Sequence, residues 1–166
     1  MTLPLSPIPE AARIHQTPVC HSDFDARLRF ARRHSRYLDQ LLTARPAIEP
    51  WLVTHAQQPL TASTLLDFLT NTLAQSEVSG SDEALQQALR GLRQRVMAHL
   101  IVRDIADGAS LAEIVETMTL LADVTTRYAL DHLHFELVKR YGAPCNSSNE
   151  PLHLAIIGMG KLGGRE

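Results

Sequence analysis

Four closely spaced glycines form the pattern in this chain that is best suited to chemistry. They lie in the string LAIIGMGKLGGRE, residues 154–166, directly after four apolar residues. Apolar, partly β-branched residues that run into glycines are typical of a buried strand presenting backbone N–H groups to an anion. Glycine permits positive φ and close approach of a ligand, and a lysine adds a mobile positive charge. The residues predicted to bind phosphate are Gly158, Gly160, Lys161, Gly163 and Gly164.

The spacing of these glycines leaves more than one interpretation open. Gly158, Gly160 and Gly163 fit G-x-G-x-x-G, but a dinucleotide site needs a complete βαβ unit and an acidic residue ~20 positions further on. Only three residues follow Gly163. A Walker A loop needs Ser or Thr after its lysine, where Leu162 stands. The pattern favours a strand followed by a phosphate loop and a helix starting at Arg165, with an ordinary tight turn as the alternative.

Other candidate chemistry is weaker. His132 and His134 are two residues apart on a predicted helix, so they point away from each other, unlike a zinc-binding i, i+4 pair. Cys20 and Cys145 lie in polar surroundings without the neighbouring pattern of a nucleophile. No Gly-x-Ser-x-Gly elbow occurs. We therefore expect ordinary histidines and inert thiols.

The string IIGMGKLGGRE resembles the nucleotidyltransferase signature of the bifunctional glutamine synthetase adenylyltransferase/adenylyl-removing enzymes. In that family the string continues into a leucine and a Ser-Asp-Ile-Asp segment whose aspartates hold a divalent metal. The resemblance implies that the five residues named above bind nucleotide phosphate, and that no residue of this chain is a metal ligand. Arg103-Asp104 is similar to an Arg-Asp pair that precedes the signature in the family. By itself this pair would be an exposed intrahelical ion pair.

The resemblance implies a function for a longer protein. The family attaches AMP to a tyrosine of glutamine synthetase and removes it by phosphorolysis, using Mg²⁺, with ATP/ADP and phosphate as substrates. It also implies glutamine synthetase and a PII-type signal protein as partners. This chain looks like an amino-terminal piece of the adenylyl-removing half, inactive alone because the aspartates are missing. The alternatives are a non-catalytic helical protein-interaction module and a truncated dinucleotide-binding oxidoreductase.

The composition is that of an ordinary globular protein. The chain has 166 residues, of which 45% are hydrophobic and 20% charged, and a net charge of −2. This balance indicates neither nucleic acid nor membrane as a partner. A cluster of arginines around residues 27–36 is expected to be a solvated helix face. Few cysteines, no signal peptide and no long apolar run predict a cytoplasmic protein.

Residue periodicity predicts a mainly α chain. We expect a helical bundle with two long antiparallel helices, followed by the first strand and glycine turn of a truncated α+β nucleotidyltransferase domain. The expected divisions are a flexible lead-in (1–21), a helical region (22–142), a loop (143–151) and the start of the nucleotidyltransferase domain (152–166). The predicted strand, 152–157, has no partner in this chain, so its apolar side chains should be exposed or poorly ordered.

Start and stop signals place the helices. The first is expected from Ser22 to Pro46, and a short one follows with Pro50 in its first turn and Trp51 as a core anchor. Further starts are expected at Thr61 or Ser63, at Ser81 and at Ser110, the last forming a capping box with Glu113. Expected stops are Gly108 and Gly142, and Gly91 lies where a close helix contact would be possible. The apolar stripe of the last helix is predicted to contain Leu111, Ile114, Val115, Met118, Ala122, Thr125 and Ala129.

Overall fold

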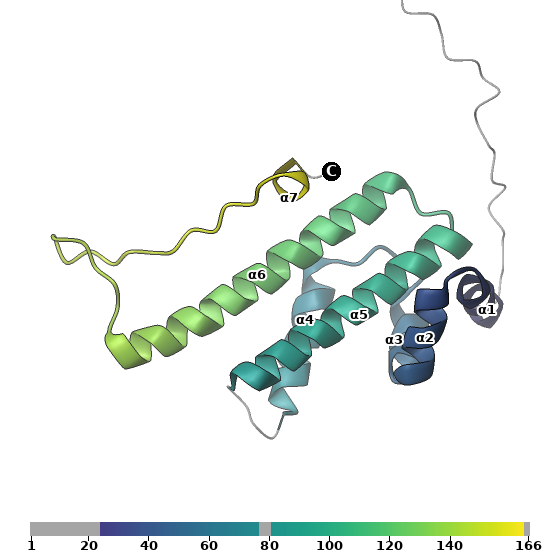
Figure 1. The fold of residues 1–166 in the computed structure, drawn as a ribbon, viewed down its shortest axis with the longest axis horizontal. Helices are drawn as coiled ribbons and strands as arrows, with labels where there is room; N and C mark the ends of the chain where they lie inside the picture. Colours follow the sequence, from purple (N-terminus) through teal and green to yellow (C-terminus); the bar gives the residue numbers. More distant parts are fainter. Residues whose placement is uncertain (1–23, 77–80, 165–166) are drawn as a thin grey trace, which may run out of the picture.

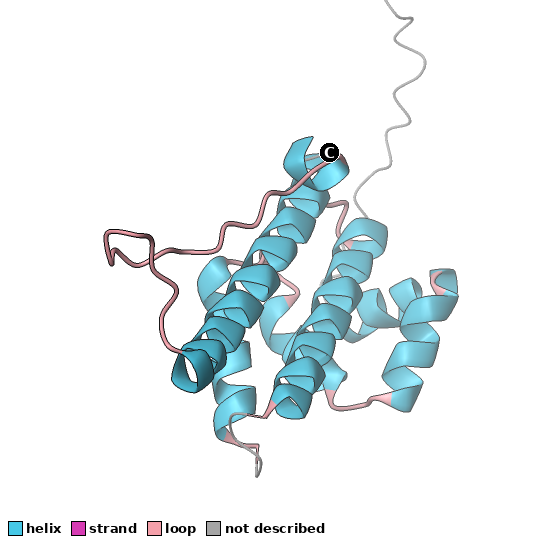
Figure 2. Cartoon of the chain, turned by 60° about the vertical axis from the view of Figure 1, so that its left-hand side comes forward, coloured by secondary structure: helices cyan, strands magenta, loops and turns pink. Residues whose placement is uncertain are grey.

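Helices make up most of residues 24–76 and 81–164, the parts of the chain described by the computed structural model (Figure 1). The body contains α1 (Phe24–His34), α2 (Arg36–Ala44), α3 (Ile48–His55), α4 (Ala62–Ala74), α5 (Asp82–Ala106) and α6 (Leu111–Tyr141). A single turn, α7 (Lys161–Gly164), follows an extended segment. The described residues contain no strand, and the predicted mainly α fold is confirmed (Figure 2).

The first predicted helix is divided in two at Ser35. Its backbone is extended, with φ −129° and ψ 102°, and its hydroxyl accepts a hydrogen bond from the N–H of Leu38. Serine competes for backbone groups in this way, which favours a helix start over a helix interior. One continuous helix up to Pro46 is therefore the wrong prediction. The predicted cap Ser22 lies outside the described residues.

Helices α1, α2 and α3 pack against the C-terminal half of α5 around a first apolar core. Trp51 of α3 is half-buried and contacts both this core and a second one, which fits its predicted role as an anchor. Pro50 lies in the first turn of α3, where a missing N–H costs little. The buried residues of the first core are Leu28, Ala31, Leu38, Leu41, Leu42, Ile48, Leu52, Ala56, Ala98 and Val102.

A second core joins α4, α5 and α6. The hydroxyl of Thr61 accepts a hydrogen bond from the N–H of Thr64, and that of Ser81 accepts one from Ala84, so both predicted caps are confirmed. These caps satisfy N–H groups that the first helical turn leaves free. The buried residues of this core are Leu60, Leu65, Leu69, Ala88, Leu92, Val96, Leu100, Leu121 and Val124.

Helices α5 and α6 run antiparallel, as predicted (Figure 1). Gly108 reverses the chain with φ +66°, a left-handed conformation that glycine adopts without steric cost. Ser110 then caps α6, since its hydroxyl accepts a hydrogen bond from the N–H of Glu113 at 3.1 Å. Neither long helix, nor any other in the described residues, is long and apolar enough to cross a membrane.

The buried face of α6 differs from the predicted stripe. Thr117, Leu121 and Val124 are its buried residues, with spacings of four and three that keep them on one side of the helix. Leu111, at the start of the predicted stripe, is 79% exposed. Apolar side chains occur around much of α6, so periodicity alone did not identify the face that contacts α4 and α5. Packing against those helices decides it.

Gly91 is buried in α5 and faces the side chain of Phe68. A Cβ built at Gly91 would lie 3.5 Å from Nη1 of Arg95 and 3.8 Å from the Phe68 ring, which are ordinary contact distances. The close helix contact predicted to be possible at Gly91 is thus made by the Phe68 side chain, and it does not require glycine. A methyl group fits the available space.

The predicted strand at 152–157 is wrong for this structure. Residues 152–159 have no regular secondary structure, and their side chains are exposed, with Ile157 at 82%. A strand needs a neighbour to satisfy its backbone groups, and the described residues provide none. The exposure that we expect of an unpaired apolar segment is confirmed. Ahead of it, the loop turns back at an isolated bridge between Cys145 and Pro151.

Candidate functional site

Residues 158–164, here called the glycine segment, form a compact turn that leads into α7. Gly160 has φ +63°, and its carbonyl accepts a hydrogen bond from the N–H of Gly164 at 2.9 Å. Helix α7 begins at Lys161, earlier than the predicted start at Arg165, which lies outside the described residues with Glu166. The left-handed conformation of Gly160 is the physical reason for glycine at this position.

Gly163 is required for a different reason. A Cβ at Gly163 would lie 2.5 Å from the carbonyl oxygen of Gly158, closer than real Cβ atoms approach a backbone oxygen. A Cβ at Gly158 would lie 3.4 Å from Cγ of Leu162, which is an ordinary contact distance. Substitution at Gly163 must therefore open the turn. The positive φ of Gly160 and the short contact at Gly163 explain two glycines sterically, and phosphate binding by the segment stays a prediction.

A groove of about 1180 Å³ separates the glycine segment from α4 and α6. Figure 2 shows the segment running back along α6 towards the start of that helix. Gly158, Leu162 and Gly163 line the groove, but its charged residues on α6 are Asp123, Asp131 and Arg127. Two carboxylates against one guanidinium do not favour an anion. Any phosphate at the segment would therefore depend on backbone N–H groups and on Lys161.

The glycine turn itself contributes no magnesium ligand. Across the described parts of the chain, no group of three or more His, Cys, Asp and Glu side chains could hold a metal ion. The segment from Gly158 to Gly164 carries no carboxylate, whereas Mg²⁺ is usually bound through one or two carboxylates together with phosphates and water.

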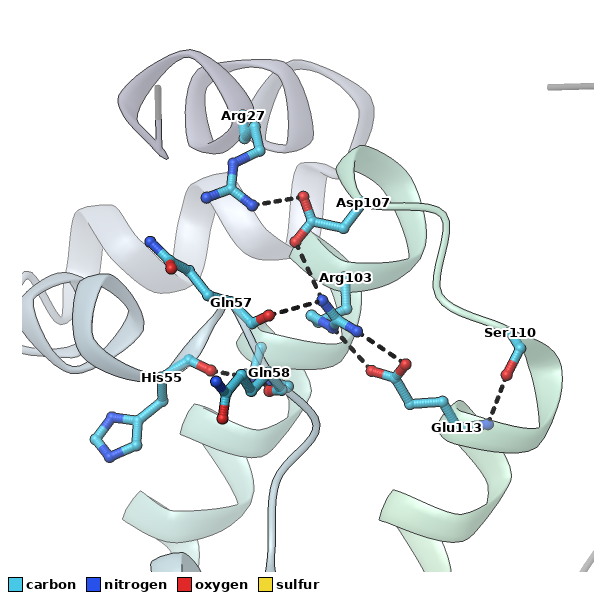
Figure 3. A network of polar contacts seen from close by, with 9 residues as sticks. Arg27, His55, Gln57, Gln58, Arg103, Asp107, Ser110 and Glu113 are labelled. Atoms are coloured by element: carbon cyan, nitrogen blue, oxygen red, sulfur yellow. Dashed lines mark hydrogen bonds and ion pairs between the residues drawn. The ribbon is translucent and has the colours of Figure 1, made fainter. Parts of the chain in front are cut away.

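The Arg103-Asp104 segment differs from the predicted intrahelical ion pair. Arg103 binds Glu113 of α6 through two hydrogen bonds, of 2.8 and 2.9 Å (Figure 3). It also lies 3.7 Å from Asp107 and donates to the carbonyl of Gln57 at 3.4 Å. Asp104 is exposed and forms no ion pair with any described residue. Arg103 therefore joins α6 and the α3–α4 connection to α5.

Asp107 extends this network to α1. Its Oδ1 accepts a hydrogen bond from Nη1 of Arg27 at 2.8 Å, between side chains that are 9% and 14% exposed. The hydrogen bond with Glu113 raises the pKa of Arg103 and lowers the pKa of Glu113, so both charged states are favoured. Sequence analysis missed these pairs because the partners are 10 and 80 positions apart.

His99 is another buried polar residue that sequence analysis missed. Its Nε2 lies 3.1 Å from the carbonyl oxygen of His55 and 3.0 Å from that of Gln58, which connects α5 to the end of α3. Leu92 and Val96 precede it by seven and three positions, so a core position could have been read from the helical register. The contact holds the α3–α4 connection against α5, and no reacting group lies beside it.

The remaining candidates occupy structural positions. Nε2 of His132 lies 3.2 Å from Oδ1 of Asp82, which joins α6 to the first turn of α5. The rings of His134 and His153 are 6.4 Å apart. Cys145 is exposed, with its thiol 3.5 Å from the carbonyl oxygen of Ala143, and Cys20 lies outside the described residues. None of these contacts forms a nucleophile–base pair.

Fold and site together define a helical bundle from which a glycine-rich segment extends. Comparison with known proteins then identifies its relatives. The chain belongs to the glutamate-ammonia ligase adenylyltransferase family, which matches residues 26–166.

Curated relatives carry the name bifunctional glutamine synthetase adenylyltransferase/adenylyl-removing enzyme. One from Aromatoleum aromaticum is 40% identical over 100% of this chain and 15% of its own length. Others from Burkholderia mallei and Nitrosomonas europaea are 41% and 39% identical over 80% of the chain. The chain thus spans about 15% of the length of such relatives. No solved structure matches.

Family membership favours the adenylyltransferase interpretation over the other two. Both a separate helical interaction module and a dinucleotide-dependent oxidoreductase would make the resemblance of the glycine string coincidental. The match instead covers that string together with α2 to α6 and nearly all of α1.

Proposed function

We propose that this chain forms part of an enzyme that adenylylates and deadenylylates glutamine synthetase, within the adenylyl-removing half. The observation that carries the proposal is 40% identity to a bifunctional enzyme over the whole chain. In such an enzyme the helical bundle supports the start of a nucleotidyltransferase domain. Glutamine synthetase is the protein substrate, and a PII-type signal protein is the regulatory partner.

The glycine segment is the part of the chain that contacts nucleotide in this proposal. In deadenylylation, an oxygen of inorganic phosphate bonds to the phosphorus of AMP while the bond from that phosphorus to the tyrosine oxygen breaks, giving ADP and free tyrosine. Backbone N–H groups near Gly160 and the ammonium of Lys161 stabilise charge on the phosphoryl oxygens. ATP provides the AMP group in the opposite reaction.

The exposed apolar residues before the turn support this role. Leu154, Ile156 and Ile157 are 69%, 56% and 82% exposed, although β-branched and leucine side chains are usually buried in a strand. In the proposed enzyme, residues 152–157 pair with strands supplied outside this chain. Carboxylates of that same region would hold Mg²⁺, because residues 158–164 carry none.

A chimeric enzyme tests the role of Lys161. The chain replaces the aligned segment of the Aromatoleum aromaticum relative, and formation of ADP from adenylylated glutamine synthetase is measured with phosphate present. We expect Lys161→Met to lower kcat by about 10-fold or more, because a positive charge near the phosphoryl oxygens is lost. The matched control is Lys139→Met, an exposed lysine on α6 that lies 4.0 Å from Glu136. Equal activities of the two variants would contradict the proposal.

The isolated chain should not remove AMP. The motivating observation is the lack of a metal-binding group among the described residues. Purified chain is incubated with adenylylated glutamine synthetase, Mg²⁺ and phosphate, and ADP release is measured against the chimera. Metal-dependent ADP release above the background of the Lys161→Met chain would show that the catalytic groups lie within residues 1–166.

A further inference from the structure

A second groove, of about 1000 Å³, lies between α3, α4 and α5. None of its lining residues belongs to the glycine segment or to α6. Three arginines line it, Arg45, Arg90 and Arg95, against the single carboxylate of Asp67. The groove is therefore positively charged, although the chain as a whole carries a net charge of −2. Its neutral hydrogen-bonding residues include Thr64, Asn71, Thr72 and Gln75.

Arg95 is held in place at this groove. Its guanidinium carbon lies 4.5 Å from the centre of the Phe68 ring, and its Nη1 donates to the carbonyl oxygen of Gly91 at 3.2 Å. Its Nε is buried and has no hydrogen-bond partner. The aromatic face and the backbone carbonyl thus orient the guanidinium, and no carboxylate is needed to hold it.

Arg95 differs from the partly buried Arg27 and Arg103 because it forms no ion pair. Arg27 and Arg103 each lie 2.8 Å from a carboxylate oxygen. Neither Arg95 nor Arg45 forms an ion pair with any residue in 24–76 or 81–164. Burial, and secondarily the positive charge of Arg45, lower the pKa of Arg95. A partly buried positive charge without a counterion is unfavourable, so an anion between the two arginines would stabilise the site.

We propose that this groove binds the oxyanion group, phosphate or carboxylate, of a small polar molecule. Arg95 is the binding residue that is held in place, and the exposed Arg45 is the second binding residue. Guanidinium groups bind both kinds of oxyanion with paired hydrogen bonds. The amide side chains of Asn71 and Gln75 line the same groove and provide donors and acceptors for the rest of the molecule. This site is separate from the glycine segment and does not depend on the proposed enzymatic function.

Titration of the isotope-labelled chain tests this site. Inorganic phosphate, pyrophosphate and succinate are added at constant ionic strength, and nuclear magnetic resonance follows the Nε–H of Arg95 and the backbone N–H of Gly91. We expect saturable shifts of both signals, and the probe that binds most tightly identifies phosphate or carboxylate as the preferred group. Shifts that rise linearly with all three anions, or no shifts at all, would overturn the proposal.

Variants locate the binding. Arg95→Gln and Arg45→Gln should each weaken binding by about 10-fold or more, because a charge-assisted hydrogen bond is lost. Arg93→Gln is the matched control, since Arg93 is exposed on α5 and does not line the groove. Arg45 is exposed, so its variant decides the result even if Arg95→Gln does not fold. Equal loss of affinity in Arg93→Gln and Arg45→Gln would show non-specific binding and contradict the proposal.

Discussion

The surroundings of the buried side chain of His99 fix its protonation state. Its Nε2 faces two backbone carbonyl oxygens, at 3.1 and 3.0 Å, and must therefore carry a proton. Its Nδ1 is buried without a hydrogen-bond partner, so a second proton there would be unsatisfied. Burial, with a smaller contribution from the charge of Arg103, lowers the pKa of His99, and this outweighs the opposing effects of the carbonyl bonds and Glu113.

The lowered pKa of His99 predicts loss of stability in mild acid. The unfolded histidine, with its ordinary pKa of 6.5, binds a proton before the folded one does. Protonation therefore favours unfolding as the pH falls below 6.5. The contribution of His99 to the free energy of unfolding is fully present only above pH 6.5. We expect the free energy of unfolding to fall between pH 7.5 and about pH 5, measured by urea titration.

The variant His99→Gln separates this effect from other titrations. Glutamine can donate to a backbone carbonyl but does not titrate, so the variant should be less stable at neutral pH and show a smaller loss in acid. His153→Gln, at an exposed histidine, should keep the acid response of the unchanged chain. An identical acid response in His99→Gln would assign the pH dependence to other groups.

At the scale of the helices, the connection between α5 and α6 holds the bundle together through charge pairs. Arg103 binds Glu113 across the turn, and Asp107 binds Arg27 of α1 (Figure 3). Glu113 was expected to complete a capping box with Ser110. Only the bond from the Glu113 N–H to the Ser110 hydroxyl forms, because the carboxylate binds Arg103 instead. The same residue thus fixes the start of α6 and its position beside α5.

Loss of Arg103 should destabilise the bundle. We expect Arg103→Met to lower the free energy of unfolding by about 1–3 kcal/mol, since the carboxylates of Glu113 and Asp107 lose a partner in a partly buried setting. Urea titration of the purified chain measures this change. In a double-mutant cycle, Glu113→Gln should cost much less in the Arg103→Met background than alone.

Asp104 provides the matched control for this prediction. It is the neighbour of Arg103 in the family-like segment, but it is exposed and unpaired among the described residues. Asp104→Asn should therefore change the free energy of unfolding by less than about 0.5 kcal/mol. Equal effects at Arg103 and Asp104 would mean that the segment contributes through its overall charge and not through the pairs seen here.

For the whole molecule, the C-terminal extension contributes little to the folded core. From residue 143 to 164 every side chain is exposed except Asn146, which is intermediate. Both apolar cores lie within α1 to α6 and the connections between those helices. A chain shortened to residues 1–142 should therefore unfold cooperatively, with a free energy of unfolding within about 1 kcal/mol of the unchanged chain.

Urea titration of both chains, followed by circular dichroism, measures this difference. The extension also exposes Leu154, Ile157 and Met159, and large exposed apolar groups promote association. The shortened chain should therefore self-associate less at high concentration, as measured by light scattering. A large loss of stability on shortening would show that the extension packs against the bundle more closely than in this structure.

Sequence patterns predicted best those features whose causes are local. Ser81 and Ser110 cap helices through bonds to residues three positions ahead, and Gly108 ends a helix through its own φ. The glycine string is also local, and its resemblance to the adenylyltransferase signature agrees with the family match. By itself, then, the sequence determined the mainly helical fold, most helix boundaries and the family.

The tertiary structure decided what depends on residues far apart in the chain. The buried side of α6 follows from contacts with α4 and α5, and the partners of Arg103 and His99 come from other helices. The segment 152–157 has a strand-like composition but no neighbouring strand among the described residues, so its backbone stays unpaired. Composition sets what a segment can form, whereas burial and pairing require a second segment at the right distance.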